Sequence, residues 1–362
     1  MSESMIEQSA ERLFSQNVDR ALLERFEAGE WPGKLWLLAA DNGFPLALAP
    51  ESAGGIGATW SEAYPMLRGL GYWQVPLPLS ETMIAALLLS RAGLAIPDGP
   101  IAIVDEHESA GLALTQGAGG LSLHGRARRV PWARYCRHAL VALADGIVLV
   151  GLDDPGTTRM TQRVNVAREP EDEVLFEGAM CLARAANPLP GLTEPVRALN
   201  ALARSVMMVG ALEWLLEQSV QYACDRVQFG RPIGKNQAIQ QNLALMAGDV
   251  AAARMAAMVA CGDAPDCTAS DYPAALFGIA VAKIRAGEAA TRGASIAHQV
   301  HGAIGFTYEH ALNFATRRLW AWREACGTDA WWAQKLGEAA ISARAKGFWP
   351  AMTSRHFDAM NL

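Results

Sequence analysis

The segment RVQFGRPIGKNQ, from Arg226 to Gln237, carries the strongest structural signal in the chain. It lies between two long stretches of helical sequence, so it is predicted to join the end of one helix to the start of the next. It supplies an arginine, a phenylalanine, two glycines and an amide. A guanidinium group can hold a pyrophosphate in a fixed plane, and glycine lets backbone approach a ligand closely. The segment therefore predicts a phosphate-binding corner; the alternative is a plain interhelical turn with Phe229 buried.

A second segment, QVHGAIGF from Gln299 to Phe306, follows the next long helical stretch. A helix is predicted to end near His301, and Gly302 fits its C-cap. The two glycines, Gly302 and Gly305, would form a loop that can lie under a flat or charged group. Taken alone, this segment is better explained by a simple helix cap than by a binding site.

The sequence outside these segments divides into three parts. From about residue 189 onward, apolar residues recur at helical spacing, which predicts a helical bundle. Residues 98–188 hold short β-rich runs between Gly, Asp and Pro, which predict a small antiparallel β domain. Residues 1–97 look helical, with a glycine-rich turn at Pro50–Gly57 and a helix start predicted at Ser80.

The predicted fold is therefore α+β with three domains. They are an N-terminal helical domain (1–97), a central small antiparallel β domain (98–188) and a C-terminal four-helix bundle (189–362). Helices and strands that are segregated in this way exclude an alternating βαβ dinucleotide-binding fold.

Composition limits the function further. The 362 residues carry a formal net charge of -6, which argues against nucleic acid as a partner. The six cysteines are scattered and form no pattern with metal-ligand spacing, so we expect reduced thiols, no metal and a cytoplasmic protein. The first residues lack the apolar segment of a signal peptide. Apolar runs look shorter than the roughly 20 residues that a membrane span requires, so no span is expected.

Together, the two segments read R-x-x-F-G, then Gln237 eleven residues after Arg226, then Q-x-x-G-x-x-G-F sixty-two residues later. This combination resembles the C-terminal domain of acyl-CoA dehydrogenases, in which these segments hold the ADP half of an FAD that sits mainly on the neighbouring subunit. The resemblance implies FAD-binding roles for the matching residues. They are Arg226, Phe229 and Gln237 at the pyrophosphate and adenosine, Gln299, Val300, Gly302 and Gly305 on the adenine side, and Thr328 as a further cofactor contact.

The resemblance extends to the N-terminal helices through Pro50–Gly57 and the stretch from Gly69 to Thr82, but the β domain departs from it. Members of the family usually carry a T-E-P-x-x-G-S-D type flavin segment and a tryptophan-containing strand that packs on the isoalloxazine ring. The corresponding region, near Leu114–Gly120, has no such motif. This departure puts the chain's own site for the flavin ring in question.

The family reaction also requires a base, usually a glutamate, that removes the α-proton of the acyl thioester while hydride leaves for the flavin. In many members the glutamate lies in an R-x8-E-G-T context, and the matching stretch here places Cys326 at that position. A free thiol has a pKa near ~8.5 and its thiolate prefers to act as a nucleophile. We therefore interpret Cys326 as a small buried residue.

Other members carry the base on the first helix of the bundle. Ungapped counting back from Phe229 places Asn200 there, and an amide cannot accept the proton. Glu324 is the least unfavourable substitute, but on a helix it would point about 200° away from Cys326, and an ion pair with Arg323 or Arg318 is the preferred interpretation. Both base positions are thus predicted to be empty.

The motif from His301 to His310, followed by Arg317, is similar to bacterial heteromeric acyl-CoA dehydrogenases that act on bulky or steroid side-chain CoA thioesters. The resemblance implies an α2β2 assembly in which a paralogous subunit supplies the base and the flavin pocket, and this chain supplies the ADP-binding half. It also implies FAD as cofactor, an acyl-CoA substrate and an electron-transfer flavoprotein as acceptor. The alternatives are a self-sufficient homomeric dehydrogenase with a relocated base, and a non-catalytic scaffold subunit.

Overall fold

A computed structural model describes residues 5–105, 107, 109–117, 120–266, 272–307 and 310–356. The N-terminal part consists of α1 (Met5–Asn17), α2 (Arg20–Glu27), α3 (Gly33–Asp41), α4 (Trp60–Tyr72) and α5 (Leu79–Arg91), with short 3-10 helices at η1 (Phe44–Leu46) and η2 (Glu51–Ala53). The C-terminal part consists of α6 (Pro195–Asp225), α7 (Gln237–Asp263), α8 (Tyr272–His301), α9 (Leu312–Glu324) and α10 (Asp329–Ser354).

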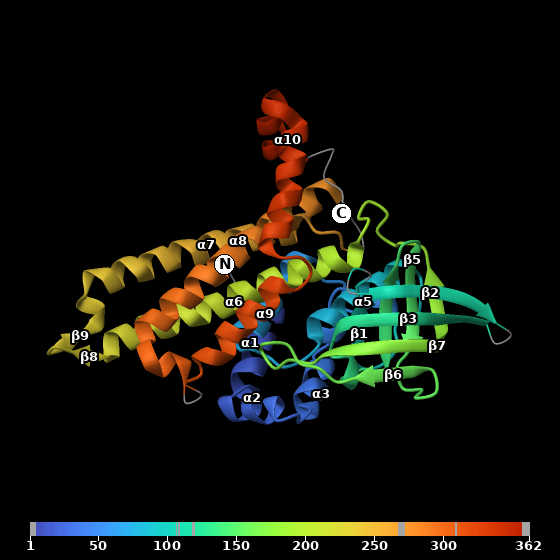
Figure 1. Ribbon diagram of the computed structural model, residues 1–362, viewed down its shortest axis with the longest axis horizontal. Coiled ribbons are helices and arrows are strands. Elements are labelled where there is room, and N and C mark those ends of the chain that lie inside the picture. Colours follow the sequence, from blue (N-terminus) through green and yellow to red (C-terminus); the bar gives the residue numbers. More distant parts are fainter. Residues whose placement is uncertain are drawn as a thin grey trace.

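Between them lies a curled sheet (Figure 1). Its strands are β1 (Ile101–Val104), β2 (Ser109–Gly117), β3 (Gly120–Pro131), β4 (His138–Leu143), β5 (Gly146–Gly151), β6 (Thr158–Thr161) and β7 (Glu171–Ala185). They are ordered β1-β4-β5-β7-β3-β2, and β6 pairs with β7. This succession of helices, sheet and helices confirms the predicted fold class.

One strand pair differs from the antiparallel prediction. β1 and β4 run parallel, with Ile101 opposite His138, whereas the other paired strands run antiparallel. The reason is the long β2–β3 hairpin, which follows β1 and occupies the opposite edge of the sheet. After this excursion the chain re-enters next to β1 in the same direction.

The strands beside the helices are buried on both faces because alternate side chains enter two different cores. Ile101 and Ile103 on β1 join the large core that the N-terminal helices share with the bundle. Ala102 and Val104, which point the other way, join the smaller core inside the curled sheet. The sheet is therefore fixed against the helices by the alternation of its own apolar side chains.

α4 and α6 pack at backbone contact through two glycines. A Cβ on Gly71 would lie 1.7 Å from the carbonyl oxygen of Met207, and a Cβ on Gly210 would lie 1.9 Å from that of Arg68. No side chain fits at either position, so these glycines set the distance between the N-terminal helices and the bundle.

A helix starts within one residue of the predicted start at Ser80, but Ser80 does not cap it. α5 begins at Leu79, and Ser80, Glu81 and Thr82 are buried inside it. The Glu81 carboxylate forms an ion pair with Arg204 of α6, which compensates its burial. A polar triplet that resembled a helix cap instead anchors α5 to the bundle.

Among the described residues, two helices are long and apolar enough to cross a membrane, by length and composition alone. This differs from the expectation of short apolar runs, because alanine-rich helical sequence keeps the mean hydropathy high over many residues. In α6 the apolar window is 83% buried, as befits the central helix of the bundle. In α7 it is 28% buried, so this helix presents much apolar surface.

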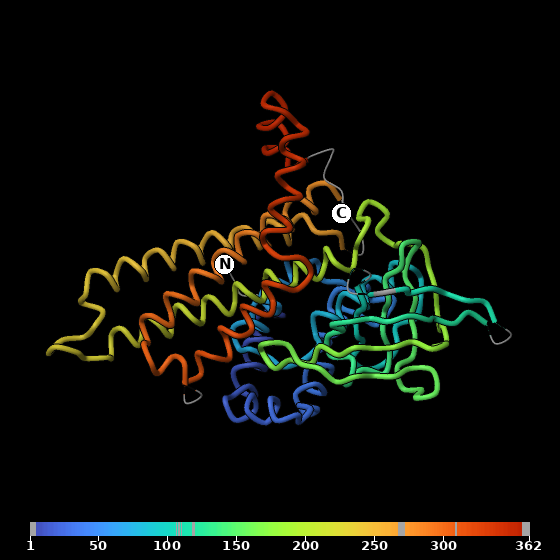
Figure 2. The backbone as a smooth tube through the Cα atoms, viewed as in Figure 1, coloured from blue at the N-terminus to red at the C-terminus, as the bar shows by residue number. Residues whose placement is uncertain are grey.

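Two elements extend from the body of the molecule. The β2–β3 hairpin projects from the sheet at one end, and α10 rises from the bundle (Figure 2). α10 is bent at Arg344, where φ is +55°. At the end opposite the sheet lie the α6–α7 connection and the end of α8 (Figure 1).

Candidate functional site

The predicted phosphate-binding corner is a small β-hairpin rather than a plain turn. α6 ends at Asp225, and β8 (Val227–Gln228) pairs with β9 (Arg231–Pro232) before η5 (Ile233–Lys235) leads into α7. The two turn residues, Phe229 and Gly230, have φ of +52° and +78°, the left-handed pair that a two-residue hairpin favours. The phenyl ring of Phe229 is fully exposed. The alternative of a buried Phe229 is therefore wrong.

The second segment forms the end of α8 and η6 (Gly302–Phe306). Gly302 is exposed and left-handed, with φ of +63°, as expected of a helix end. Gly305 is buried, and a Cβ there would lie 3.0 Å from both His301 and Leu312. Close packing within the chain therefore favours glycine at this position. Val300 is also buried, in the helical core.

The two segments come together through aromatic rings. Tyr222, one turn before Arg226 on α6, stacks on His301 of α8, with 4.5 Å between the ring centroids. His310 contacts both of these rings edge-on. Burial lowers the pKa of His301 and of His310. Tyr308 and Glu309 of the original motif lie outside the described residues.

Of the residues predicted to contact FAD, five lie exposed at this end of the molecule: Arg226, Phe229, Gln237, Gln299 and Gly302. Gln237 is the first residue of α7, where free backbone N–H groups favour an anion. Thr328 lies elsewhere, in the loop before α10. There its hydroxyl oxygen accepts a hydrogen bond from the Trp331 amide at 3.1 Å, so it caps that helix.

An open groove of about 870 Å³ runs along α8 at the same end. It is lined by Thr291, Ser295, His298, Gln299, Gly302, Phe306 and Trp320. The sequence motifs included Gln299 and Gly302 but gave no signal for Trp320, which comes from α9.

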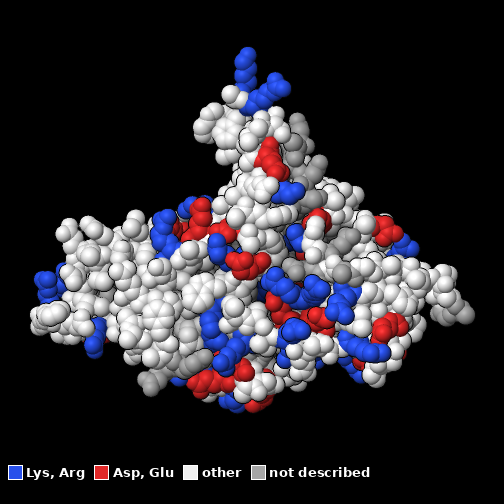
Figure 3. All heavy atoms as spheres, viewed as in Figure 1, with Lys and Arg blue, Asp and Glu red and all other residues white. Residues whose placement is uncertain are grey.

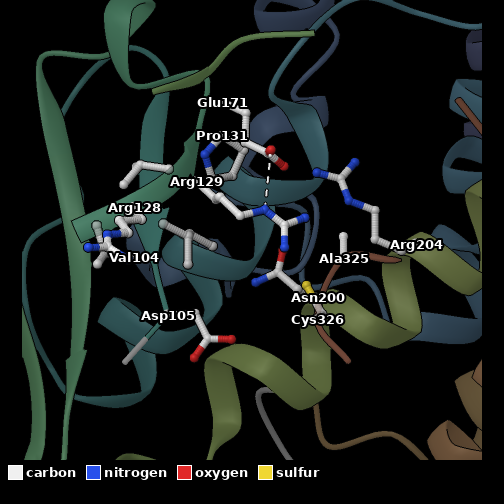
Figure 4. A pocket seen from close by; sticks show the side chains of 12 residues that line it. Val104, Asp105, Arg128, Arg129, Pro131, Glu171, Asn200, Arg204, Ala325 and Cys326 are labelled. Atoms are coloured by element: carbon white, nitrogen blue, oxygen red, sulfur yellow. Dashed lines mark hydrogen bonds and ion pairs between the residues drawn. The ribbon is translucent and has the colours of Figure 1, made fainter. Parts of the chain in front are cut away.

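A second hollow, the central cavity, lies between the sheet on one side and α6 with the loop after α9 on the other (Figure 4). The empty space within it, including the part open to solvent, is about 570 Å³. The lining residues are Ile103, Val104, Asp105, Arg128, Arg129, Val130, Pro131, Glu171, Asn200, Arg204, Ala325 and Cys326. Both predicted base positions, Asn200 and Cys326, therefore open into one cavity.

Neither residue can take up a proton at neutral pH. The Asn200 amide donates to the Val196 carbonyl oxygen at 2.8 Å. Burial raises the pKa of the Cys326 thiol to about 11, so it stays protonated. Glu324 does not line the cavity; its carboxylate is 53% exposed and pairs with Arg323 at 3.2 Å. The Glu324–Arg323 ion pair agrees with the sequence interpretation.

The cavity does contain carboxylates that the motifs did not reveal. Glu171, at the start of β7, pairs with Arg129 of β3 at 3.3 Å, and burial raises the pKa of Glu171. Asp105 pairs with Arg197 at 3.1 Å. Arg129 sits at a β-bulge with φ of +52°, an arrangement that often re-aims a side chain at a functional site.

The central cavity and the exposed hairpin lie at opposite ends of α6. Asn200 and Arg226 are 26 positions apart, since 226 − 200 = 26. At 1.5 Å per residue this is about 39 Å of helix, more than the diameter of a small domain. The region near Leu114–Gly120 is also remote from the cavity, at the tip of the β2–β3 hairpin; Ala118 and Gly119 lie outside the described residues.

Comparison with known proteins adds a family context. The C-terminal domain of acyl-CoA dehydrogenases matches residues 197–341. The acyl-CoA dehydrogenase IpdE2 of Mycobacterium tuberculosis is 30% identical over 296 residues, which are 78% of this chain and 79% of that protein. The acyl-CoA dehydrogenase FadE27 of the same organism is 30% identical over 304 residues, 77% of this chain and 80% of that protein.

Solved structures share the fold at lower identity. A variant of the Tcur3481-Tcur3483 steroid ACAD aligns with a TM-score of 0.82 at 23% identity, covering 94% of this chain and 98% of that one. The ChsE4-ChsE5 complex from Mycobacterium tuberculosis aligns with a TM-score of 0.81 at 23% identity, covering 95% and 99%.

Proposed function

This chain belongs to the acyl-CoA dehydrogenase family, and on that basis we propose that it is the base-lacking subunit of a heteromeric, FAD-dependent acyl-CoA dehydrogenase. The observation that carries the proposal is that Asn200 and Cys326, the two positions predicted for the base, line one cavity and are both neutral. The catalytic base would then come from a paralogous subunit. Two of the structural neighbours, the Tcur3481-Tcur3483 steroid ACAD and the ChsE4-ChsE5 complex, each combine two differently named chains, which supports this arrangement.

The exposed end of the bundle fits the nucleotide half of FAD. Arg226 would neutralise the pyrophosphate, and Gln237 would present its amide beside the N-terminal N–H groups of α7. The phenyl ring of Phe229, which is fully exposed in this chain, would cover the nucleotide. FAD, when bound, supplies the acceptor for the hydride that leaves the acyl β-carbon.

The separation along α6 supports a flavin ring held by another polypeptide. A ligand bound at Arg226 lies about 39 Å of helix away from Asn200, so it cannot also reach this chain's central cavity. The acyl-CoA substrate would accordingly bind on the partner beside the flavin ring. We place the complex in the cytoplasm, with an electron-transfer flavoprotein as the acceptor.

The decisive experiment measures the FAD content of the complex formed with the paralogous subunit. Arg226→Met should weaken FAD binding about 10- to 100-fold, because a charge-assisted hydrogen bond contributes about 1.5–3 kcal/mol. Arg231→Met, five residues further along the same hairpin, serves as the matched control and should leave FAD content unchanged. Equal FAD content in both variants would support a scaffold subunit instead.

A second candidate is a self-sufficient homomeric dehydrogenase with Glu171 as the relocated base. The observation in its favour is that Glu171 lines the cavity and its pKa is raised by burial, as a base at neutral pH requires. The sequence favoured Glu324 for this role, but that carboxylate points to solvent. Under this alternative the purified chain turns over acyl-CoA alone and Glu171→Gln abolishes turnover.

A further inference from the structure

The central cavity has no ligand under the proposed function, which places the flavin ring and the acyl thioester on the partner subunit. Two of its arginines are nonetheless held by separate ion pairs. Arg204 pairs with the fully buried Glu81, and its own side chain is 9% exposed. Arg129 and Glu171 pair at 3.3 Å, and their side chains are 41% and 19% exposed. Of the two pairs, Arg129–Glu171 is therefore the one that a ligand from solvent can reach.

A β-bulge places two adjacent arginines in the wall of the cavity. The register of β3 against β7 shifts between Ala127 and Val130, so Arg128 and Arg129 together oppose one residue of β7. Neighbouring side chains of a regular strand face opposite ways, but Arg128, Arg129 and Val130 all line the cavity. The left-handed φ of +52° at Arg129 is the kind of backbone strain that persists at ligand sites. Arg128 is exposed and forms no ion pair within the described part of the chain. The bulge therefore concentrates positive charge on this wall.

Much of the remaining wall is aliphatic or uncharged. The aliphatic residues are Ile103, Val104, Val130, Pro131 and Ala325. The amide of Asn200 is neutral, and the thiol of Cys326 stays protonated because burial raises its pKa to about 11. A guanidinium group beside aliphatic surface suits an anion that carries an apolar body.

Glu171 indicates which anion the Arg129 guanidinium accepts. Its carboxylate accepts a hydrogen bond from Nε of Arg129 at 3.3 Å, and the Arg129 side chain reaches from this contact toward the middle of the cavity (Figure 4). A free carboxylate at the same guanidinium would compete with this intramolecular one. Burial raises the pKa of Glu171, so its carboxylate takes up a proton more readily than an exposed glutamate once it loses Arg129. Protonation thus lowers the cost of displacing Glu171.

We propose that the central cavity binds a free aliphatic or alicyclic monocarboxylate, whose carboxylate pairs with Arg129 in place of Glu171 and whose apolar body packs on Val104 and Val130. The exchange is non-covalent: Arg129 keeps one carboxylate partner, and Glu171 takes up a proton from solvent. The acid would bind without reacting, because Asn200 and Cys326, the two base positions, are neutral. This assignment rests on the proposed function, which leaves the cavity free of flavin and thioester.

The test is calorimetric titration of the purified full-length chain with hexanoate and with hexanamide, its uncharged counterpart. Hexanoate should bind about 10- to 100-fold more tightly than hexanamide, because a charge-assisted hydrogen bond is lost in the amide. Butanoate should bind about 15-fold more weakly than hexanoate, because two fewer methylene groups are buried. Arg129→Met should lower hexanoate affinity about 10- to 100-fold. Arg159→Met is the matched control and should leave it unchanged, since Arg159 belongs to the same sheet and has its own carboxylate partner, Glu177.

Glu171→Gln gives the sharper prediction. The variant should bind hexanoate more tightly than wild type at pH 7.5, because the competing carboxylate is gone. In wild type the affinity should rise by up to about tenfold for each unit that pH falls, because one proton is taken up with the ligand. The charged groups that act on Glu171 are Arg129 of β3, Arg204 of α6 and Glu169 beside β7. Glu171→Gln should abolish the pH dependence, whereas the control Glu177→Gln, on the same strand, should retain it.

Three results would each overturn the inference. They are equal affinity for hexanoate and hexanamide, wild-type affinity in Arg129→Met, and weaker hexanoate binding in Glu171→Gln. Circular dichroism checks that each variant is folded, and if Arg129→Met is not, Glu171→Gln decides the question alone. The proposed function is tested separately, by the dependence of FAD content on Arg226 in the complex. The titration contains no flavin, so either idea can fail without the other.

Discussion

Hydrogen bonds from Trp332 and Lys283 fix the loop that carries Cys326. Its backbone has φ of +57°, in the left-handed region, and its carbonyl oxygen accepts a hydrogen bond from the Trp332 indole at 3.0 Å. On the other side of this loop, the buried Lys283 ammonium donates to the carbonyl oxygens of Trp322 and Arg323. The loop after α9 is thus held rigidly, and Cys326 faces the cavity as a neutral group.

The pKa of about 11 for Cys326 has a direct chemical consequence. At pH 7.5 its thiolate fraction should be about 300-fold lower than that of a free cysteine with a pKa near ~8.5. We expect iodoacetamide to alkylate Cys326 far more slowly than the exposed Cys224, with a rate that rises towards pH 11. Peptide mass spectrometry after timed quenching measures both sites in one sample. Equal rates at pH 7.5 would contradict the assignment.

At the scale of elements, the β8–β9 hairpin has a sequence poorly suited to its own geometry. Phenylalanine in a left-handed turn position carries backbone strain of about 1–2 kcal/mol, and the ring buries nothing in this chain. Phe229→Asn should therefore leave the free energy of unfolding of the isolated chain within about 0.5 kcal/mol of wild type or raise it. The same change should lower FAD retention by the complex.

A matched control separates these effects. Val227→Asn changes a neighbouring exposed residue of the same hairpin and should alter neither property. Urea unfolding gives the free energies and flavin absorbance gives the retention. A large loss of stability in Phe229→Asn would show that the ring is buried after all.

The histidines between α6, α8 and α9 make this end of the bundle sensitive to acid. Burial lowers the pKa of His298, His301 and His310 below the ordinary value near 6.5. As pH falls through 6.5, the unfolded chain binds protons before the folded chain does, so stability is complete above that pH and is lost below it. We expect a lower urea midpoint at pH 5.5 than at pH 7.5. The difference should shrink in His301→Phe, which keeps a ring against Tyr222; an unchanged difference would exclude His301.

Local sequence patterns predicted most helices and strands but not the tertiary contacts between them. The spacing of apolar residues revealed α7 and α8, because residues three or four positions apart lie on the same face of a helix. The hairpin after α6 escaped prediction because Phe229-Gly230 lacks the Asn-Gly signature of its turn. Ser80 was mistaken for a helix cap because the neighbouring Glu81 is buried through its ion pair with Arg204, more than a hundred residues away in the sequence.

The candidate site shows the same division. Motif spacing located Arg226, Gln237 and Gln299, and counting identified Asn200 and Cys326 as the two base positions, which the structure brings together in one cavity. Glu171 and Trp320 could not be found in this way. Each reaches its site through tertiary packing. No motif surrounds Glu171, and the motif that spans Trp320 assigns it no role.

For the whole molecule, the distribution of polarity points to association. The end of the bundle that carries α7 is mostly uncharged in Figure 3, whereas Lys, Arg, Asp and Glu gather near the middle of that face. α7 itself exposes apolar side chains, among them Leu245, Met255, Met258 and Val259. Exposed patches of this kind mark subunit contacts.

Placing a charge on this surface should disrupt the proposed assembly. We expect Met255→Lys to shift the complex towards separate chains in analytical ultracentrifugation, because an unpaired ammonium would be buried at the contact. Ile56→Lys, on an exposed apolar residue of the N-terminal part, should leave the sedimentation profile unchanged. Identical profiles for both variants would place the contact elsewhere.

The glycine pair between α4 and α6 limits how this chain can exchange parts with its relatives. Gly71 and Gly210 each face the backbone of the other helix. A chimera that takes its N-terminal helices from a relative must therefore have glycine at both positions. Recombination that brings alanine to one of them would force the two helices apart and displace Glu81 from Arg204. We therefore expect chimeras of related chains to fold when α4 and α6 come from the same parent.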